Sequence, residues 1–216
     1  MPLHKKQVLI VFYSFTRQTK LMLNKFIEGL ESEGIEVTMQ RLVPVSPYDF
    51  PFKSYGGLIK ATIETFFQIR SEIKPIDEKC YGNWDRVIIA GPTWSYHPSS
   101  PVLEFLDRYG RDVCGGQHVI PFISCRAYWR VHNWGLRRRL KKCGAGVIGA
   151  PIVFTHLIRE PWRTIGLIMQ MRGKMVRKEE NSWFRKRYPG YGHNREQRTV
   201  ALEKGRQLAR ELFDRP

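Results

Sequence analysis

The feature that most constrains the fold is an uninterrupted apolar run near the start of the chain, residues 8–13. Three of its six residues are β-branched (Val8, Ile10 and Val11), and apolar and polar residues do not alternate. A strand of this composition is buried on both faces, which is typical of a central strand in a parallel sheet. The chain is therefore expected to build a sheet that helices cover on both sides.

A hydroxyl-rich loop follows this strand directly. Ser14, Thr16 and Thr19 lie within residues 14–19, and an amphipathic helix with apolar residues at positions 23, 26, 27 and 30 begins next. The first amide groups of a helix lack intrahelical acceptors and carry the positive end of the helix dipole, so this loop is a candidate phosphate-binding site. The alternative is that the hydroxyl groups only cap the helix.

The rest of the chain alternates between predicted strands and helices. Further strands are expected at residues 35–40, 85–90, 117–124 and 147–154, and a closing helix follows Asn194, whose pairing with Gln197 resembles a capping box. This alternation predicts a doubly wound α/β fold with a five-stranded parallel sheet in the order 2-1-3-4-5.

Two of the connecting helices have apolar stripes that suggest how they pack. One stripe consists of Leu58, Ile59, Ile63, Phe66, Phe67 and Ile73, and it is expected to pack on the sheet. A basic helix over residues 127–142 is expected to bury Val131, Trp134 and Leu140.

Three loops should meet at one edge of such a sheet. In a doubly wound fold, ligands bind outside the carboxyl ends of the strands, where the strand order reverses. The loops at residues 14–19, 91–98 and 124–130 follow the strands that end there. The second loop offers Trp94 and Tyr96 as flat surfaces for stacking, and the third offers aromatic side chains and a cation.

These loops resemble those of the flavodoxin-like family, which binds FMN. Ser-Phe-Thr-Arg-Gln-Thr at residues 14–19 is similar to the family's Ser/Thr-x-Thr-Gly-Asn/Gln-Thr phosphate loop, with arginine in place of glycine, and Gly-Pro-Thr-Trp at 91–94 is similar to its ring-binding turn. The resemblance covers about residues 5–155, and the whole chain, residues 1–216, is expected to form a single flavodoxin-like domain. The FMN contacts that it and the loop positions imply are Ser14, Thr16, Arg17, Gln18, Thr19, Pro92, Thr93, Trp94, Ser95, Tyr96, Cys125, Arg126, Tyr128 and Trp129.

The charges expected around the site favour two-electron chemistry. Arg126, Arg130 and His97 lie in or beside the ring loops, and these loops contain no carboxylate. A cation stabilises reduced anionic flavin, whereas negative charge suits a low-potential one-electron carrier. We therefore expect hydride transfer from NAD(P)H through FMN to a quinone-like acceptor, without a protein nucleophile. The alternative is a flavodoxin-type electron carrier without its own NAD(P)H activity.

A closer resemblance points in the same direction. Cys-Arg-x-Tyr-Trp at residues 125–129 is similar to flavodoxin-like proteins described as dialkylresorcinol-condensing or NAD(P)H-dependent oxidoreductases. Cys125 itself is interpreted as an inert buried thiol. A dinucleotide-binding Rossmann fold is disfavoured, because no Gly-x-Gly-x-x-Gly follows the first strand.

A basic insertion at residues 155–192 separates the fifth strand from the closing helix. The chain has a formal net charge of +16, which indicates an anionic partner. Residues 162–188 combine apolar, aromatic and basic residues, so they are expected either to lie on an anionic membrane face or to form a solvated cover. A non-enzymatic nucleic-acid-binding module is a third, less favoured alternative.

The remaining expectations concern location and assembly. The four cysteines lack metal-binding spacing, and neither a signal peptide nor a membrane-spanning run is apparent, so a cytoplasmic protein with reduced thiols, peripheral at most to the inner membrane face, is expected. No metal site is expected. A homodimer is compatible with the resemblance.

Overall fold

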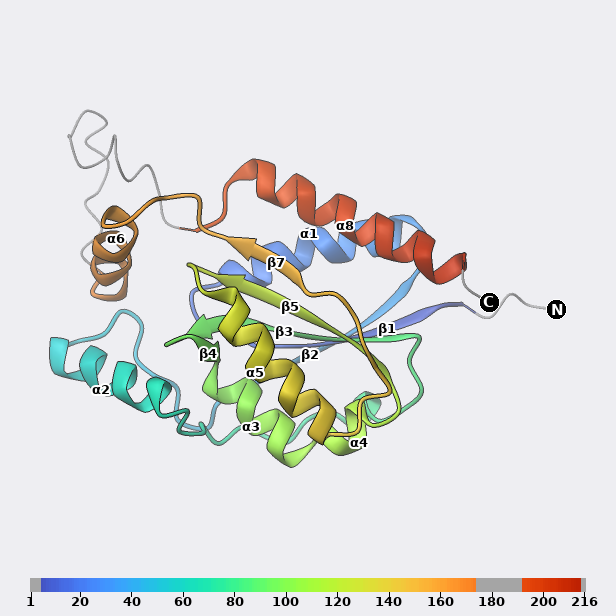
Figure 1. Ribbon diagram of the computed structural model, residues 1–216, viewed down its shortest axis with the longest axis horizontal. Coiled ribbons are helices and arrows are strands. Elements are labelled where there is room, and N and C mark those ends of the chain that lie inside the picture. Colours follow the sequence, from blue (N-terminus) through green and yellow to red (C-terminus); the bar gives the residue numbers. More distant parts are fainter. Residues whose placement is uncertain (1–4, 174–191, 215–216) are drawn as a thin grey trace.

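A computed structural model describes residues 5–173 and 192–214, and these form a three-layer α/β structure (Figure 1). The sheet lies in the middle, with helices packed on both of its faces. Its strands are β1 Gln7–Phe12, β2 Glu36–Arg41, β3 Arg86–Trp94, β4 His97–Pro98, β5 His118–Cys125, β6 Val147–Ile148 and β7 Ile152–Thr155.

The predicted fold class and strand order are confirmed. The hydrogen-bonded order is β2-β1-β3-β5-β6, and β7 pairs with β5 beyond β6, so the positions along the chain read 2-1-3-4-5. All of these pairs are parallel. Only β4 is antiparallel, and it forms a short hairpin with β3. This is the flavodoxin-like topology.

The fifth position of the sheet differs from the prediction because the strand is split. Residues 149–151 separate β6 from β7. Pro151 has no N–H to donate to a neighbouring strand. The guanidinium of Arg137 donates to the carbonyl oxygens of Ile148 at 3.1 Å and Gly149 at 2.7 Å, which satisfies acceptors at the break.

Two hydrophobic clusters hold the helices on the sheet. One face is covered by α1 Gln18–Ser32 and α8 Arg195–Phe213, and the other by α3 Ser100–Arg108, α4 Gly110–Cys114 and α5 Trp129–Lys142 (Figure 1). Side chains of β1 alternate between the two: Ile10 joins the first cluster and Leu9 the second. The strand is therefore buried on both faces, as its composition predicts.

Helices α1 and α8 approach each other closely at two glycines. A Cβ on Gly29 would lie 2.1 Å from the carbonyl oxygen of Leu202, and a Cβ on Gly205 would lie 2.1 Å from that of Phe26. The contact therefore requires glycine on both helices. At the start of α8, the predicted capping box of Asn194 and Gln197 is present.

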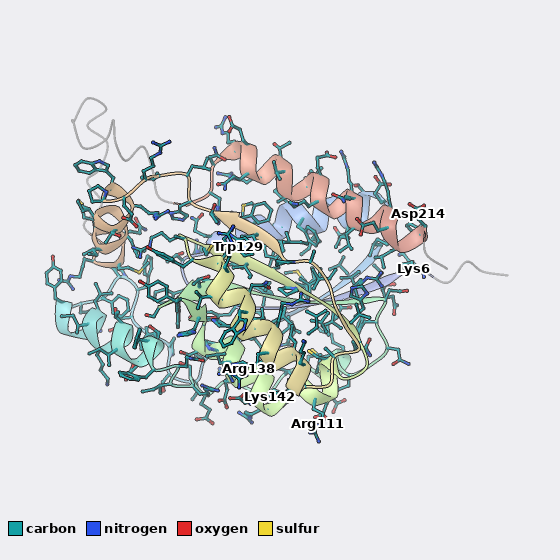
Figure 2. All side chains as sticks on the ribbon, in the orientation of Figure 1. Lys6, Arg111, Trp129, Arg138, Lys142 and Asp214 are labelled. Atoms are coloured by element: carbon teal, nitrogen blue, oxygen red, sulfur yellow. The ribbon has the colours of Figure 1, made fainter. Side chains whose placement is uncertain are left out.

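The interpretation of two apolar stripes was wrong. In α5, Leu140 is buried as expected, but Val131 and Trp134 are exposed and His132 and Leu136 are buried in their place. The exposed side of this helix also carries Arg138 and Lys142 (Figure 2).

Helix α2, Tyr55–Phe66, does not pack its whole stripe on the sheet either. Ile59, Ile63 and Phe66 are exposed, as is Phe67 just after the helix, while Ile73 is buried outside it in a bridge to Pro44. The helix lies beyond one end of the sheet, next to α6 (Figure 1).

Part of the basic insertion forms α6, Trp162–Met171. The backbone N–H of Phe52 donates to the carbonyl oxygen of Met171 at 2.7 Å, and Arg172 lies over the ring of Tyr55. These contacts join the end of α6 to the start of α2 and to the segment before it. The membrane-facing segment was expected over residues 162–188, and its residues 174–188 lie outside the described residues. Within the described part of the chain, no helix combines the length and apolar character needed to cross a bilayer. The described residues also include a short 3-10 helix, η1 Glu78–Cys80.

The glycine contact between α1 and α8 predicts the effect of Gly205→Ala. The new methyl group would overlap backbone atoms of α1, so we expect the free energy of unfolding to fall by about 1–3 kcal/mol. Gly56→Ala in the exposed first turn of α2 is the matched control, because its nearest neighbour would be Ser54 Oγ at 3.9 Å. That control should leave stability unchanged or raise it by up to about 1 kcal/mol. Urea denaturation of both variants measures the difference, and equal midpoints would contradict it.

Candidate functional site

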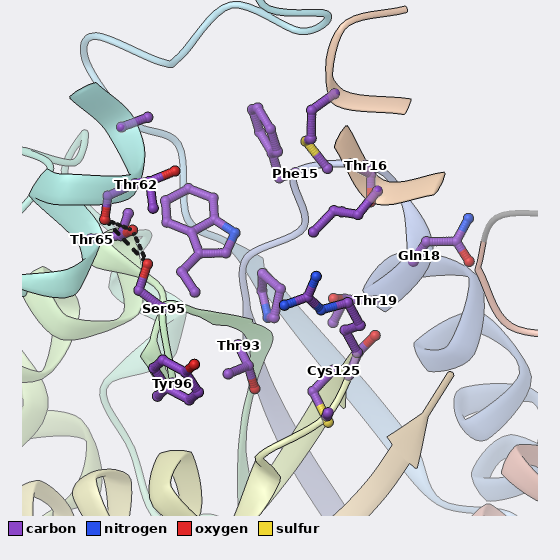
Figure 3. Close-up of a pocket in the computed structure, with 18 of the residues that line it drawn as sticks. Phe15, Thr16, Gln18, Thr19, Thr62, Thr65, Thr93, Ser95, Tyr96 and Cys125 are labelled. Atoms are coloured by element: carbon purple, nitrogen blue, oxygen red, sulfur yellow. Dashed lines mark hydrogen bonds between the residues drawn. The ribbon is translucent and has the colours of Figure 1, made fainter. Parts of the chain in front are cut away.

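The three predicted loops meet at the carboxyl ends of β1, β3 and β5 around one cavity of about 360 Å³ (Figure 3). This volume lies in the range of small-molecule sites, about 300–1,000 Å³. The predicted site residues that line the cavity are Thr16, Gln18, Thr19, Pro92, Thr93, Trp94, Ser95, Tyr96, Cys125, Arg126 and Tyr128. Ser14, Arg17 and Trp129 are not among its lining residues.

The first loop leaves the first two amide groups of α1 without a side-chain cap, next to the cavity. Arg17 is the N-cap of α1 and supplies no side-chain acceptor. The Ser14 hydroxyl accepts from Lys20 N at 3.2 Å, so it caps the helix from outside the cavity. The amide groups of Gln18 and Thr19, one and two residues after the cap, are not satisfied by this cap and lie beside the cavity-lining side chains of the same residues.

Arg17 adopts a left-handed backbone conformation, with φ of 64°. The resembling phosphate loop has glycine at this position, and glycine adopts positive φ without steric cost. Arg17 therefore has a backbone conformation that glycine adopts more readily. Its side chain is exposed and does not line the cavity.

The second loop is a tight hairpin that the sequence did not reveal. Trp94 pairs with His97, and the two residues between them have positive φ, 43° at Ser95 and 73° at Tyr96. This combination is the one that a type I′ turn requires. The usual signal for this turn is Asn-Gly, which is absent here, so only a general loop could be predicted.

Two hydroxyl groups of this loop are bonded to neighbouring helices. Ser95 Oγ lies 2.7 Å from Thr65 Oγ1 and donates to the Thr62 carbonyl oxygen at 3.2 Å, both on α2 (Figure 3). Thr93 Oγ1 lies 2.8 Å from Nδ1 of the buried His132 on α5. These bonds hold the hairpin in place and engage both side-chain hydroxyls within the protein.

Aromatic rings form one wall of the cavity. Trp94 contacts Phe15 and Tyr13 edge-on, with centroids 5.6 and 5.5 Å away, and Tyr48 lies at 5.8 Å. Tyr96 and Tyr128 form a second pair at 4.9 Å, and both are about half exposed. The wall therefore presents fixed apolar surfaces on which a planar ligand could pack.

The third loop places one cation at the cavity. Arg126 donates through Nη1 to Thr164 Oγ1 at 2.9 Å, so α6 holds its guanidinium in position. Burial raises the pKa of the Cys125 thiol to about 11, which keeps it protonated at neutral pH, in agreement with an inert thiol. Trp129 contacts the guanidinium of Arg130 at 5.0 Å outside the cavity (Figure 2 labels Trp129).

Of the three cations expected at the site, the structure therefore places only Arg126 at the cavity. Neither Arg130 nor His97 lines the cavity; His97 is half-buried in β4. No aspartate or glutamate is present among the cavity-lining residues of the described chain. The site is thus weakly positive, with Arg126 as its charged group.

A second set of wall residues was missed in the sequence. Helix α2 contributes Leu58, Ala61, Thr62 and Thr65, whose spacing of three, four and seven positions marks one helical face. This spacing is visible in the sequence. The opposite face of the same helix is more apolar, however, and the sequence therefore predicts that this opposite face packs inward. Phe15, Ser124 and Ala127 also line the cavity; they lie inside the predicted loops but are not among the predicted contacts. The other missed residues, for which the sequence carries no such signal, are Tyr48, Phe52, His156, Leu167 and Met171.

A series of hydrogen bonds connects Ser124, which lines the cavity, to the start of α8. Gln197 Nε2 donates to the Thr155 carbonyl oxygen at 2.7 Å, so its Oε1 accepts from His193 Nδ1 at 3.2 Å. Nε2 of His193 is then the acceptor for the Ser124 hydroxyl at 2.8 Å. Gln18 Oε1 accepts from the His193 amide at 3.0 Å, so its side chain also secures the start of α8.

His156 lines the cavity and lies next to His193 of this hydrogen-bond series. Its ring centroid is 5.5 Å from that of His193. Burial, together with the nearby His193, Arg163 and Arg126, lowers the pKa of His156 to about 4. The imidazole is therefore neutral at pH 7.

Comparison with known proteins supports the fold. No family model matches the sequence, and no curated protein matches it. A solved flavoprotein from Lactobacillus acidophilus, in complex with FMN, is 20% identical over 68% of this chain and 93% of its own, with a TM-score of 0.52. A structure from Bacteroides eggerthii is 17% identical over 70% of this chain and 90% of its own, with a TM-score of 0.56.

A third similar structure is a rubredoxin oxygen:oxidoreductase from Desulfovibrio gigas, 13% identical. It covers 97% of this chain but only 37% of its own length, with a TM-score of 0.51. The structural neighbours include flavodoxin-like flavoproteins, and the chain shares their fold. At these identities the similarity establishes the fold alone.

The buried His156 predicts how stability depends on pH. An unfolded histidine takes up a proton near pH 6.5, whereas folded His156 does so only near 4, so the free energy of unfolding falls as the pH drops between these values. Between pH 7.5 and 5 this residue should account for a loss on the order of 1–2 kcal/mol. Urea denaturation of wild type and His156→Gln at both pH values should show a smaller loss in the variant; equal losses would contradict the assignment.

Proposed function

We propose that the cavity binds FMN and that the protein is an FMN-dependent oxidoreductase, which takes hydride from NAD(P)H and reduces a quinone-like acceptor. The observation that carries this proposal is the convergence of the three loops on one cavity, with donors for a phosphate on one side and aromatic surfaces on the other (Figure 3). FMN, when bound, would supply the site that accepts and passes on hydride.

The donors of the first loop suit a phosphate group. The hydroxyl-bearing side chains of Thr16 and Thr19 line the cavity next to the first amide groups of α1, a helix of 15 residues. A helix N-terminus favours a negative charge, and its amide groups hydrogen-bond phosphate oxygens. Ser14 supports this end indirectly, because its hydroxyl accepts from the amide of Lys20 and leaves the two amide groups before it available.

The opposite side of the cavity suits a planar, largely apolar ring. Trp94 and Tyr96 come from the hairpin, and Trp94 is held edge-on by its aromatic neighbours. Because Ser95 and Thr93 use their hydroxyls on α2 and α5, the hairpin orients a ring through stacking and backbone groups. Residues of α2 and α6, including Leu58, Leu167 and Met171, give the remaining wall an apolar surface suited to a quinone-like molecule.

The charge of the site supports two-electron chemistry. Arg126 is the cation at the cavity, and the carboxylates that would favour a low-potential carrier are missing from its described lining. A fixed positive charge stabilises the negative charge that develops on a reduced flavin ring. The role assigned to Arg126 is therefore electrostatic stabilisation, with its position set by Thr164.

The phosphate assignment predicts the effect of Thr16→Val combined with Thr19→Val. Each lost hydrogen bond to a charged group is worth about 1.5–3 kcal/mol, so FMN affinity should fall at least about tenfold. Riboflavin has no phosphate, so its affinity should change little. Titration of the apoprotein with each flavin, followed by flavin fluorescence, measures both.

The matched control is Thr199→Val, since Thr199 lies on α8 and its hydroxyl bonds only to the Arg195 carbonyl oxygen at 3.4 Å. It should leave both affinities unchanged. If wild-type protein binds FMN no better than riboflavin, the phosphate site is wrongly assigned. If it binds neither flavin, the cofactor proposal fails.

The reductase assignment predicts direct reduction by NADPH or NADH. When either is mixed anaerobically with the FMN-loaded protein, the oxidised-flavin absorbance should disappear without a partner reductase and return when a soluble quinone is added. Arg126→Gln should slow the first step severalfold, because it removes the positive charge at the cavity.

Arg130→Gln is the control for charge, because Arg130 lies over Trp129 outside the cavity. Equal slowing by both variants would indicate a general charge effect rather than a role for Arg126. Absorbance that persists with both nucleotides, but disappears with a separate flavodoxin reductase, would identify an electron carrier instead.

A further inference from the structure

The outward face of α2 is a row of exposed apolar side chains. Ile59, Ile63 and Phe66 are 58%, 51% and 53% exposed, and Phe67, directly after the helix, is 70% exposed. Their spacing of four, three and one positions keeps them on one side of the helix. We call this row the α2 stripe; contiguous apolar surface of this kind usually marks an interaction site.

The inward face of the same helix is already used. Leu58, Ala61, Thr62 and Thr65 line the cavity, and Ser95 bonds to this face. A rotation that buried the α2 stripe would remove these residues from the cavity wall. A helix that is apolar on both sides is normally buried, so the α2 stripe requires a cover that the described part of the chain does not supply.

Charge indicates what the cover is. Residues 53–70 contain three cations and one acid, Glu64. The side chains of Lys53 and Lys60 are 85% and 76% exposed, and they form surface ion pairs with Asp49 at 3.3 Å and Glu64 at 3.8 Å. The Glu64 side chain is 25% exposed and also accepts from Tyr48 at 2.7 Å. The stripe is therefore flanked by accessible lysines, in a chain with a formal net charge of +16.

Helix α6 extends this surface. It lies beside α2 at the same end of the molecule (Figure 1), and its Ile165 and Ile168 are exposed. Both helices also contribute inward residues, Leu58 from α2 and Leu167 from α6, to the cavity. The outer apolar surface and the cavity wall are thus two sides of the same helix pair.

We infer that the outer faces of α2 and α6 dock on the surface of an anionic lipid bilayer, with the α2 stripe buried at the boundary between headgroups and acyl chains and the lysines at the headgroups. Interfacial helices bind in this way, by apolar burial combined with attraction to anionic lipids. Docking would place the apolar cavity wall next to the bilayer, from which a lipophilic molecule could reach it. The inference does not require bound flavin.

Flotation with lipid vesicles tests this inference. The full-length protein should float with vesicles of phosphatidylcholine and phosphatidylserine, and much less with phosphatidylcholine alone. Ile59→Glu combined with Phe67→Glu should lower the partition coefficient at least about tenfold, because it places charge in the stripe. Both side chains are more than half exposed, so the fold should tolerate the changes.

The matched control is Val200→Glu combined with Phe213→Glu on α8, where both side chains are about half exposed and the change in net charge is the same. It should retain most of the binding. Equal loss in both variants would mean that only net charge matters, which would overturn the docking surface. Wild-type binding by the Ile59→Glu, Phe67→Glu variant would also overturn it. A third outcome is that the wild-type protein does not bind vesicles but is a dimer by light scattering. If the Ile59→Glu, Phe67→Glu variant is then a monomer, a second copy of the chain covers the α2 stripe, and the lipid inference is overturned. Flavin affinity, measured separately, distinguishes any of these failures from failure of the proposed function.

Discussion

Burial of β1 on both faces is the constraint on which the rest of the structure depends. Its side chains enter both hydrophobic clusters, so helices must cover both sides of the sheet. Its neighbours β2 and β3 run parallel to it, which requires each connection to cross from one end of the sheet to the other. The loops after β1, β3 and β5 consequently share one edge, and the position of the cavity follows from the topology of the sheet.

The parts of the fold that were predictable have strong local signals. Apolar patterns identified the strands, their alternation with helices gave the order, and Asn194 with Gln197 marked the start of α8. The three loops were found because they follow buried strands directly. That they meet at one cavity is now observed, whereas their binding of FMN stays a prediction.

The parts that were missed depend on information that periodicity does not contain. An apolar stripe shows which residues share a helix face but not what that face contacts, so α2 was placed on the sheet although its strongest stripe faces outward. The same ambiguity led to Trp134 being expected in the core. The hairpin at Ser95 and Tyr96 has neither glycine nor asparagine, so tertiary bonds to α2 must stabilise a turn that its own residues disfavour.

Backbone conformations that the local residues disfavour occur in all three loops of the site. Among the described residues, the non-glycine residues with positive φ are Arg17, Gln68, Ser95, Tyr96 and Tyr128, and all except Gln68 lie in the three loops. A left-handed conformation costs a residue with a Cβ roughly 1–2 kcal/mol, and glycine would avoid that cost. Strain of this kind persists where the surrounding structure fixes it, and it is concentrated at functional sites. Here it sets the turn before α1 and the contact between Tyr96 and Tyr128, which are the two features that a phosphate and a planar ring would need from opposite ends of one cavity.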